Sequence, residues 1–370
     1  MSSATEAIVK KIAVLAALAG LGSAIALMLV ACGGGSPSPA SAPRPSHWHV
    51  LPSAPQAFDQ GPAPVWTGGE LILFGRRNKT ALDSRGASYI VRSYDVAEAY
   101  DPASRTWTRL SPPPGPGYVP VYHAVWTGKE LLAFSAFHSV AYNPTTHAWR
   151  NLRRSVGGGL VVWTGREAIG WGGGCCGDAW GNGLAYNPST DTYRHLAPSP
   201  LAPSQGPIGA WTGKELVLYS TGFNPASGKP YPARLARAAA YNPATDTWRR
   251  IAPLPGIGGT AAWDGREVLV VGNGSSGRAA FAYDPAANRR RRLAAMPFGL
   301  NAPVAFWAGD RLLVWGDSES GRGLAYDPRA DRWSVLRAGP LHGSVSALAW
   351  TGRTVLVANG VHTAAFTPLG

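Results

Sequence analysis

Two adjacent cysteines, Cys175 and Cys176, are the most unusual reactive groups in this sequence of 370 residues. They lie within the glycine-rich stretch GGGCCGDAWG at residues 172–181. In an oxidising compartment such neighbours are expected to pair with each other. The disulfide ring would be strained, because consecutive Cα atoms are about 3.8 Å apart and a disulfide usually spans about 4.4 to 6.8 Å. We expect either a structural crosslink within the loop, which the sequence favours, or a rigid apolar platform that stacks on a sugar beside Trp180.

Two histidines form a second group of candidates. His123, in VPVYHAVW, is expected on an innermost strand that faces a central channel, and His138, in AFHSV, on the short loop beside it. A pair of histidines can bind a metal ion or act as acid and base near neutral pH. Single histidines are more often structural, so the sequence assigns no metal ligand, no catalytic residue and no cofactor.

Charged side chains on irregular loops complete the candidate ligand-binding residues. A guanidinium group binds a carboxylate or a phosphate through paired hydrogen bonds, although most surface arginines are simply solvated. Convergence of carboxylates with a histidine at one end of the channel would favour catalysis. The candidates of this kind are Arg76, Asp178, Arg237, Asp317 and Arg322.

A repeated motif supplies the strands that must carry these groups. A tryptophan is followed by a small or acidic residue, a glycine, usually a basic residue and a glutamate, and then an apolar run, as in WTGKELVLY at residues 211–219. Seven copies begin at Trp66, Trp126, Trp163, Trp211, Trp263, Trp307 and Trp350. Their mean spacing of about 47 residues is typical of β-propellers rather than of helical repeats.

A second motif, exemplified by AYNPATDTW at residues 240–248, alternates with the first. Its Asp-Pro or Asn-Pro step ends one strand, and the small polar residues after it reverse the chain. Copies end at Trp107, Trp149, Tyr193, Trp248 and Trp333, and a variant has Arg290 in the last position. Together the motifs predict units of four antiparallel strands. One unit cannot bury both of its apolar faces, so the units are expected to stack in a ring.

The two ends of the repeat predict how the ring closes. The last unit has three strands, the third of which contains Phe366, and it lacks a fourth. The stretch HWHVLPSAP at residues 47–55 resembles a fourth strand that precedes the first unit. The sequence therefore predicts an all-β, seven-bladed propeller over residues 47–370, closed by an N-terminal strand around Trp48.

These motifs resemble those of kelch-type β-propellers, especially the exported bacterial group related to the galactose oxidase central domain. The resemblance covers nearly all of residues 47–370 and rests on the Tyr-Asp/Asn-Pro turns, the aromatic residue seven positions after each tyrosine, and glycines at Gly75, Gly172, Gly272 and Gly316. It implies four-stranded blades that serve as a binding platform or as one of several kinds of enzyme. The double glycine of kelch repeats is clear only at residues 172–173, and no set of residues matches the copper site of galactose oxidase.

The N-terminal residues predict export. Lys10 and Lys11 precede an uncharged apolar stretch at residues 12–31, and Cys32 follows at once. The end of this stretch resembles the bacterial lipoprotein signal, so we expect residues 1–31 to be a signal peptide, Cys32 to carry lipid, and residues 32–46 to be a Gly/Ser/Pro-rich tether. The alternative is an uncleaved membrane anchor. Either version places the body on the extracytoplasmic face of a membrane, at the cell surface or in the periplasm.

The net charge of +13 could attract an anionic partner, but we expect no nucleic acid to bind. Arginines are spread through loops and strand ends, with one cluster at residues 289–292, and neither a basic helix nor a basic groove interleaved with aromatic residues is evident. We interpret most of the charge as a solvated surface.

Functional residues usually lie on irregular loops carried by a rigid scaffold. We therefore expect a monomeric binding or interaction module for a glycan, a cell-envelope polymer or a protein. The alternative is a carbohydrate-active enzyme, such as a sugar epimerase, lyase or oxidase, with its site at the channel mouth. A purely structural envelope protein is a third possibility.

Overall fold

The computed structural model describes residues 47–114, 123–135, 138–174, 177–222, 224–254, 258–272, 277–317, 321–341 and 347–368, with the backbone alone at 60–62 and 317. The chain divides into two compact units, Met1–Ala42 and Pro43–Gly370, and the described residues belong to the second. The expected signal peptide, Cys32 and the tether lie outside the described residues. Within the described ranges, no helix has the length and apolar character needed to cross a membrane.

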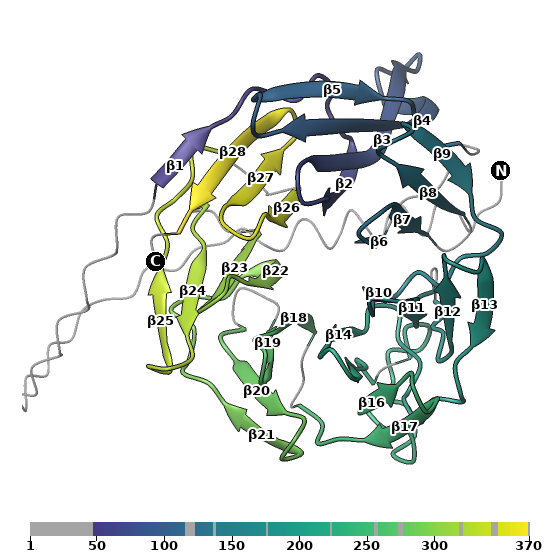
Figure 1. The fold of residues 1–370 in the computed structure, drawn as a ribbon, viewed down its shortest axis with the longest axis vertical. Coiled ribbons are helices and arrows are strands. Elements are labelled where there is room, and N and C mark those ends of the chain that lie inside the picture. Colours follow the sequence, from purple (N-terminus) through teal and green to yellow (C-terminus); the bar gives the residue numbers. More distant parts are fainter. Residues whose placement is uncertain are drawn as a thin grey trace, which may run out of the picture. The chain divides into compact units, whose positions relative to one another are not determined.

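Seven sheets of four antiparallel strands form a ring (Figure 1). The first blade contains β2 (Gln60–Trp66), β3 (Leu71–Leu82), β4 (Ser88–Asp101) and β5 (Thr106–Leu110). The second contains β6 (His123–Trp126), β7 (Leu131–Phe134), β8 (Ser139–Asn143) and β9 (Ala148–Asn151). The third contains β10 (Leu160–Trp163), β11 (Ala168–Trp171), β12 (Gly183–Asn187) and β13 (Thr192–His195). The fourth contains β14 (Ile208–Trp211), β15 (Leu216–Tyr219), β16 (Ala238–Asn242) and β17 (Thr247–Arg250).

The remaining three blades complete the predicted all-β, seven-bladed propeller, which is confirmed. The fifth contains β18 (Gly259–Trp263), β19 (Val268–Gly272), β20 (Ala280–Asp284) and β21 (Arg289–Arg292). The sixth contains β22 (Asn301–Trp307), β23 (Leu312–Asp317), β24 (Leu324–Asp327) and β25 (Arg332–Val335). The seventh contains β26 (Ala347–Trp350), β27 (Val355–Asn359), β28 (His362–Thr367) and β1 (His47–Val50).

The N-terminal strand closes the ring as predicted. β1 pairs antiparallel with β28, and Trp48 stands opposite Phe366. The Trp48 ring lies 5.0 Å from that of Phe366 and 6.4 Å from that of Trp315 in the sixth blade, measured between centroids. Its indole N–H donates to the Arg337 carbonyl at 3.3 Å. The closing strand is therefore held by both backbone pairing and aromatic packing.

Antiparallel order sorts the connections of each blade onto two faces of the ring. The turns between first and second strands and between third and fourth strands form the "turn face". The loops between second and third strands and the connections between blades form the "loop face". A typical turn has the Thr212 hydroxyl accepting from the Glu215 amide at 3.0 Å, while Gly213 adopts a φ of 86°, which glycine tolerates.

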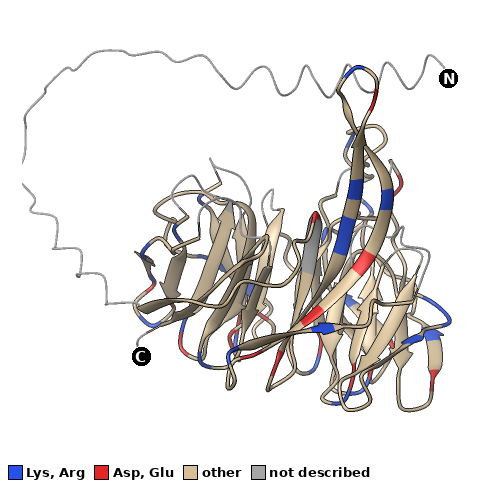
Figure 2. Ribbon diagram, turned by 90° about the horizontal axis from the view of Figure 1, so that it is seen from above, with Lys and Arg blue, Asp and Glu red and all other residues tan. Residues whose placement is uncertain are grey.

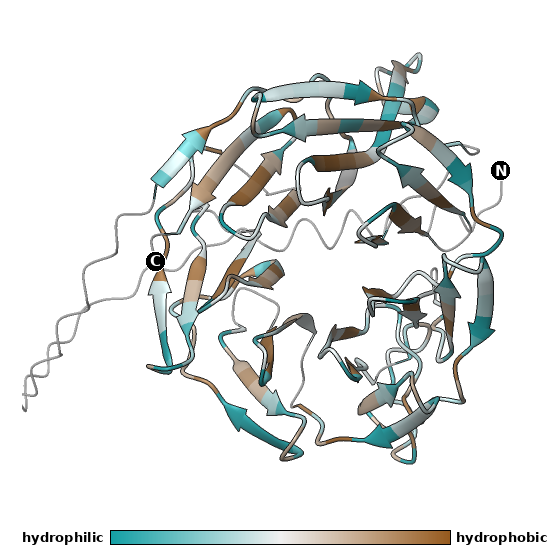
Figure 3. Cartoon of the chain, in the orientation of Figure 1, coloured by the Kyte–Doolittle hydropathy of each residue, from teal (hydrophilic) through white to brown (hydrophobic). Residues whose placement is uncertain are grey.

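Apolar side chains between neighbouring blades form the core. Leu269 of the fifth blade packs in one cluster with Leu312 and Val314 of the sixth, and all three are fully buried. In Figure 3 the inner strands are mostly hydrophobic and the outer strands mostly hydrophilic. Tyr241 is fully buried, and its ring lies 4.8 Å from that of Trp248. The repeated tyrosines and tryptophans are thus packing residues, as their periodicity predicts.

At four interfaces between neighbouring blades, called seams, an arginine forms a "seam bridge". In the seam between the fourth and fifth blades, Arg249 contacts Glu215 of its own blade at 2.7 Å and donates to the Tyr283 hydroxyl of the next blade at 3.0 Å. The tyrosine donates to an acceptor five residues further on, here Asn288 at 2.9 Å. The other bridges are centred on Arg150, Arg194 and Arg291, with Glu130, Glu167 and Glu267 and with Tyr186, Tyr241 and Tyr326.

A buried carboxylate, Glu98, lies in β4 of the first blade. Strand alternation places it on the same side as Val96 and Tyr100, which pack against the seventh blade. Neither carboxylate oxygen accepts a well-formed hydrogen bond from a described residue. Burial raises the pKa of Glu98, and the nearby Gln56 amide and Arg109 offset only part of the rise.

Replacing Glu98 with glutamine is expected to stabilise the protein at neutral pH, by about 1 to 3 kcal/mol, because it removes a buried charge. The raised pKa of Glu98 means that the native state binds its proton more tightly than the unfolded chain. The stability that protonated Glu98 contributes is therefore present at low pH and is lost as the pH rises through the pKa of Glu98 in the native state. Urea unfolding should show the gain at neutral pH and almost none at about pH 4.

Glu215→Gln is the control, because its expected change in stability has the opposite sign. Hydrogen bonds from Arg249 lower the pKa of Glu215, so its contribution is present at neutral pH and is lost as the pH falls through the native pKa. This variant should lose up to about 1 kcal/mol at neutral pH, with a smaller loss in acid. If both variants change stability in the same direction, the assignment of the two carboxylates is wrong.

Candidate functional site

A projecting hairpin dominates the loop face (Figure 2). β3 has 12 residues and β4 has 14, whereas the second and third strands of the other blades have 4 to 6. The two strands stay paired out to Leu82 and Ser88. At the tip, the Asp83 carboxylate accepts from the amides of Arg85 and Ala87, both at 2.8 Å. We call residues 76–94 the arm.

One side of the arm combines aromatic and basic side chains. Arg77 pairs with Tyr94, Lys79 pairs with Arg92, and a bulge follows before Ala81 pairs with Tyr89. Directly paired residues, and residues two apart on one strand, share a face of the sheet. These positions form the "arm stripe", which consists of Arg77, Lys79, Tyr89, Arg92 and Tyr94. Tyr89 is 52% exposed and Tyr94 is 37% exposed, so the stripe presents aromatic surface to solvent.

Two predicted site residues meet at the base of the arm around a third that the sequence analysis missed. Arg76 and Asp95 are both buried, with Arg76 Nε 3.9 Å from Asp95 Oδ1. Burial raises the pKa of Asp95, and the charges of Arg76 and His138 partly offset this effect. His138 also hydrogen-bonds the Asn151 side chain at 3.0 Å. Arg76 therefore neutralises a carboxylate of its own chain and anchors the arm.

His123 is held inside the fold. Its Nε2 atom hydrogen-bonds the Gly158 carbonyl of the neighbouring blade at 3.1 Å. Burial lowers the pKa of His123, and the hydrogen bond offsets only part of that effect. A neutral imidazole bonded to a backbone carbonyl fits a structural role. Among the described residues, no group of three or more His, Cys, Asp or Glu side chains could hold a metal ion.

The glycine-rich loop of the third blade carries four of the candidates. Cys175 and Cys176 lie outside the described residues. The Trp180 amide donates to the Gly173 carbonyl at 2.9 Å, and the Asp178 carbonyl accepts from the Gln205 side chain at 2.6 Å. Trp180 also lines a hollow of about 250 Å³ on the loop face. The loop is thus fixed by backbone hydrogen bonds, with Trp180 at its surface.

The other candidates are spread over two further blades. Arg237 is exposed and lines a second hollow on the loop face, of about 470 Å³, together with Tyr231. Arg322 is exposed on the loop between β23 and β24. Asp317 ends β23, where its backbone pairs with Asn301, and its side chain is outside the described part of the structure. The interactions of the described residues bring together Arg76 and His138, through Asp95.

Comparison with known proteins supports the fold and no more. No protein-family model matches the chain, and no curated protein matches it. Among solved structures, one described as "Structure of YjhT" is similar with a TM-score of 0.51 and 14% sequence identity. The match covers 78% of this chain and 99% of that one. At this level of identity the similarity shows a shared fold alone.

Proposed function

We propose that this chain is an exported, lipid-anchored binding module that recognises an anionic polysaccharide of the cell envelope through the arm stripe. The observation that carries the proposal is the stripe itself, in which Tyr89 and Tyr94 lie among three basic side chains on one side of a projecting hairpin. A short turn would suffice to connect β3 and β4, so the length of the hairpin calls for a functional explanation.

The chemistry of the arm fits such a polymer. Beyond Arg76, the arm has the cationic residues Arg77, Lys79, Arg85 and Arg92 and one carboxylate, Asp83. Guanidinium and ammonium groups bind carboxylates and phosphates, and the flat apolar face of a tyrosine ring offers a stacking surface beside its polar hydroxyl. An extended chain of acidic sugars presents both kinds of partner at regular intervals.

The N-terminal residues support the location. An apolar stretch at residues 12–31 is followed directly by Cys32 and by residues poor in large apolar side chains. A lipid on Cys32 would hold the body on a short flexible tether, within reach of envelope polymers. Membership of the kelch-type group and catalysis at the channel mouth both remain predictions.

The soluble body, residues 44–370, should bind a carboxylated polysaccharide such as alginate at low ionic strength and should not bind neutral dextran. In the variant Lys79→Ala/Tyr89→Ala/Arg92→Ala, the affinity for alginate should fall by at least about tenfold, because two charge-assisted contacts and one stacking contact are lost. Biolayer interferometry with immobilised polymer measures the change.

Lys129→Ala/Arg166→Ala is the matched control, because it removes two exposed charges from the turn face. It should leave the affinity within about twofold of the parent. Equal losses of affinity in the two variants would mean that binding depends on net charge alone and would overturn the proposal. The absence of alginate binding would also overturn it. Tighter binding to single-stranded DNA than to alginate would also contradict it.

A further inference from the structure

In the seam between the seventh and first blades, which we call the closing seam, three positions of the seam bridge have different residues. His49 of β1 occupies the place of the bridging arginine, directly after the aromatic residue of the fourth strand. Thr354 occupies the place of the glutamate in the Trp-Thr-Gly turn. Tyr100 is retained, but Arg105 stands five residues after it, where the four bridged seams have Asp191, Asp246, Asn288 or Asp331.

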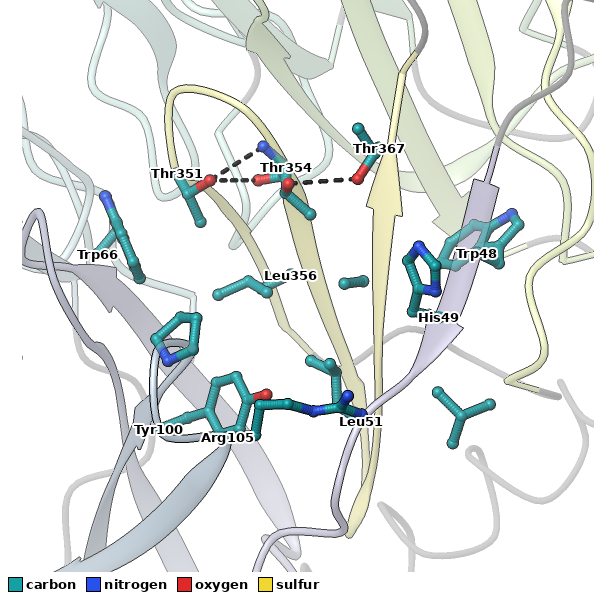
Figure 4. A pocket seen from close by; sticks show the side chains of 13 residues that line it. Trp48, His49, Leu51, Trp66, Tyr100, Arg105, Thr351, Thr354, Leu356 and Thr367 are labelled. Atoms are coloured by element: carbon teal, nitrogen blue, oxygen red, sulfur yellow. Dashed lines mark hydrogen bonds between the residues drawn. The ribbon is translucent and has the colours of Figure 1, made fainter.

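His49 and Thr354 are shorter than the arginine and the glutamate that they replace, whereas Arg105 is longer than the aspartate or asparagine that it replaces. A cavity of about 580 Å³ lies in this seam on the turn face, within the usual range for small-molecule sites. Figure 4 shows Arg105 and Tyr100 on the first-blade side, His49 on β1, and Thr354 between them. The side chains of Trp66 and Leu356 form part of the apolar wall of the cavity.

The polar side chains of the cavity include the Arg105 guanidinium group and several hydroxyls that can donate hydrogen bonds. The Tyr100 side chain is 1% exposed. Its hydroxyl lies near the Arg105 guanidinium group, but it has no hydrogen bond of good geometry among the described residues. The Thr354 and Thr367 hydroxyls lie 3.3 Å apart. Arg105 lies on the tight turn with a φ of 57°, and its side chain lines the cavity. Among the described residues, the lining contains no aspartate or glutamate.

The seam between the first and second blades shows that loss of the arginine alone does not produce this chemistry. Thr108 replaces the bridging arginine there, but Glu70 is retained. The Tyr142 hydroxyl in that seam hydrogen-bonds His147 at 3.2 Å. In the closing seam, by contrast, Arg105 has replaced the acceptor and Thr354 has replaced the glutamate.

We propose that the cavity of the closing seam, lined by His49, Trp66, Tyr100, Arg105 and Thr354, binds a small organic carboxylate with an apolar or aromatic body. The carboxylate lies beside Tyr100, where it accepts hydrogen bonds from the Arg105 guanidinium group and from the Tyr100 hydroxyl. The apolar body lies against Trp66 and Leu356. The site is separate from the arm, so it adds a second ligand to the proposed function and does not depend on it.

Calorimetric titration of the soluble body with benzoate, phenylacetate, 3-phenylpropionate and hexanoate tests the proposal. At least one acid should bind at a single site with a Kd below about 1 mM. Its primary amide should bind at least about tenfold more weakly, because the charge-assisted hydrogen bonds are lost. Arg105→Gln should lower the affinity for the acid by a similar factor. Arg332→Gln is the control, because it replaces an exposed arginine of the sixth blade, and it should leave this affinity unchanged.

A second variant places longer side chains of the protein itself in the cavity. His49→Arg/Thr354→Glu rebuilds the seam bridge, so it should abolish binding of the acid while the Tm stays the same or rises. Binding that is unaffected by either variant, equal affinity for acid and amide, or no binding of any acid in the panel would overturn the proposal. Alginate binding through the arm should be unchanged in Arg105→Gln, which keeps the two sites distinguishable.

Discussion

Removing residues 47–55 from the soluble body is expected to destabilise the propeller by about 5 kcal/mol or more. The deletion leaves β28 as an unpaired edge and removes Trp48 from its packing against Trp315 and Phe366. Loss of a partly buried tryptophan costs about 3 kcal/mol, and each lost backbone hydrogen bond costs about 1 kcal/mol. The Tm should fall by about 10 °C or more in a thermal scan.

Trp48→Ala separates the two contributions within this prediction. It retains the strand but removes the ring, so it should account for roughly half of the loss, about 3 kcal/mol. Deletion of residues 44–46, which precede β1, is the control and should leave the Tm within about 1 °C. A deletion of residues 47–55 that leaves the Tm unchanged would mean that β1 does not close the ring.

Gly170→Ala is expected to cost about 3 kcal/mol, the second largest effect. Gly170 lies in β11, and a Cβ atom added there would be 2.3 Å from the Val156 carbonyl oxygen and 2.8 Å from Val156 Cγ2. Both contacts are far inside van der Waals distance, and the backbone atom cannot rotate away. Strand β11 or the connection that contains Val156 must therefore shift, which urea unfolding will register as a lower midpoint.

Gly206→Ala is the matched control for Gly170→Ala. Its added Cβ atom would meet nothing within 4 Å, and its φ lies outside the left-handed region. The stability should change by less than about 0.5 kcal/mol. A similar loss in both variants would indicate a general cost of removing glycine rather than close packing between the third-blade strands and their connection.

The architecture was predictable because its determinants are local and repeat. Each Trp-Thr-Gly turn is held by its own threonine hydroxyl, as at Thr212, and each Asn-Pro turn by a side chain such as Asn242, which accepts from the Ala244 amide. Seven first turns, five of them Trp-Thr-Gly, give the number of blades, and six second turns accompany them because the seventh blade takes its fourth strand from the N-terminus. The closing strand was predictable for the same reason, because the last repeat lacks one strand and Trp48 carries the missing aromatic residue.

The arm was not predicted because its sequence looks like a loop. Polar and glycine residues around Asp83 and Gly86 suggested an irregular connection, but the β-branched and aromatic residues between Ser88 and Tyr94 are also typical of a strand. The aromatic and basic residues meet only across the strand pair, through contacts such as Arg77 with Tyr94. Spacing along one strand does not reveal such pairs, so the sequence analysis did not find this basic and aromatic surface.

The cavity of the closing seam left a signal in the sequence that needed the structure to interpret it. Thr354 breaks the pattern of a glutamate after the Trp-Thr-Gly turn, and Arg105 breaks the pattern of an acceptor five residues after tyrosine. These positions are about 250 residues apart. The predicted ring places them in one seam with His49, but only the structure shows the cavity that they line.

Hydrogen exchange at the first strand tests the central claim, the closure of the ring by β1, most directly. In the soluble body, mass spectrometry should show that a peptide covering residues 47–54 exchanges as slowly as one covering β9, because the Leu51 and Ala54 amides donate to the Thr363 and Val361 carbonyls at 2.9 and 2.8 Å. Exchange of the first peptide at the rate of an unstructured chain would contradict the closure and, with it, the seam on which the proposed carboxylate site depends.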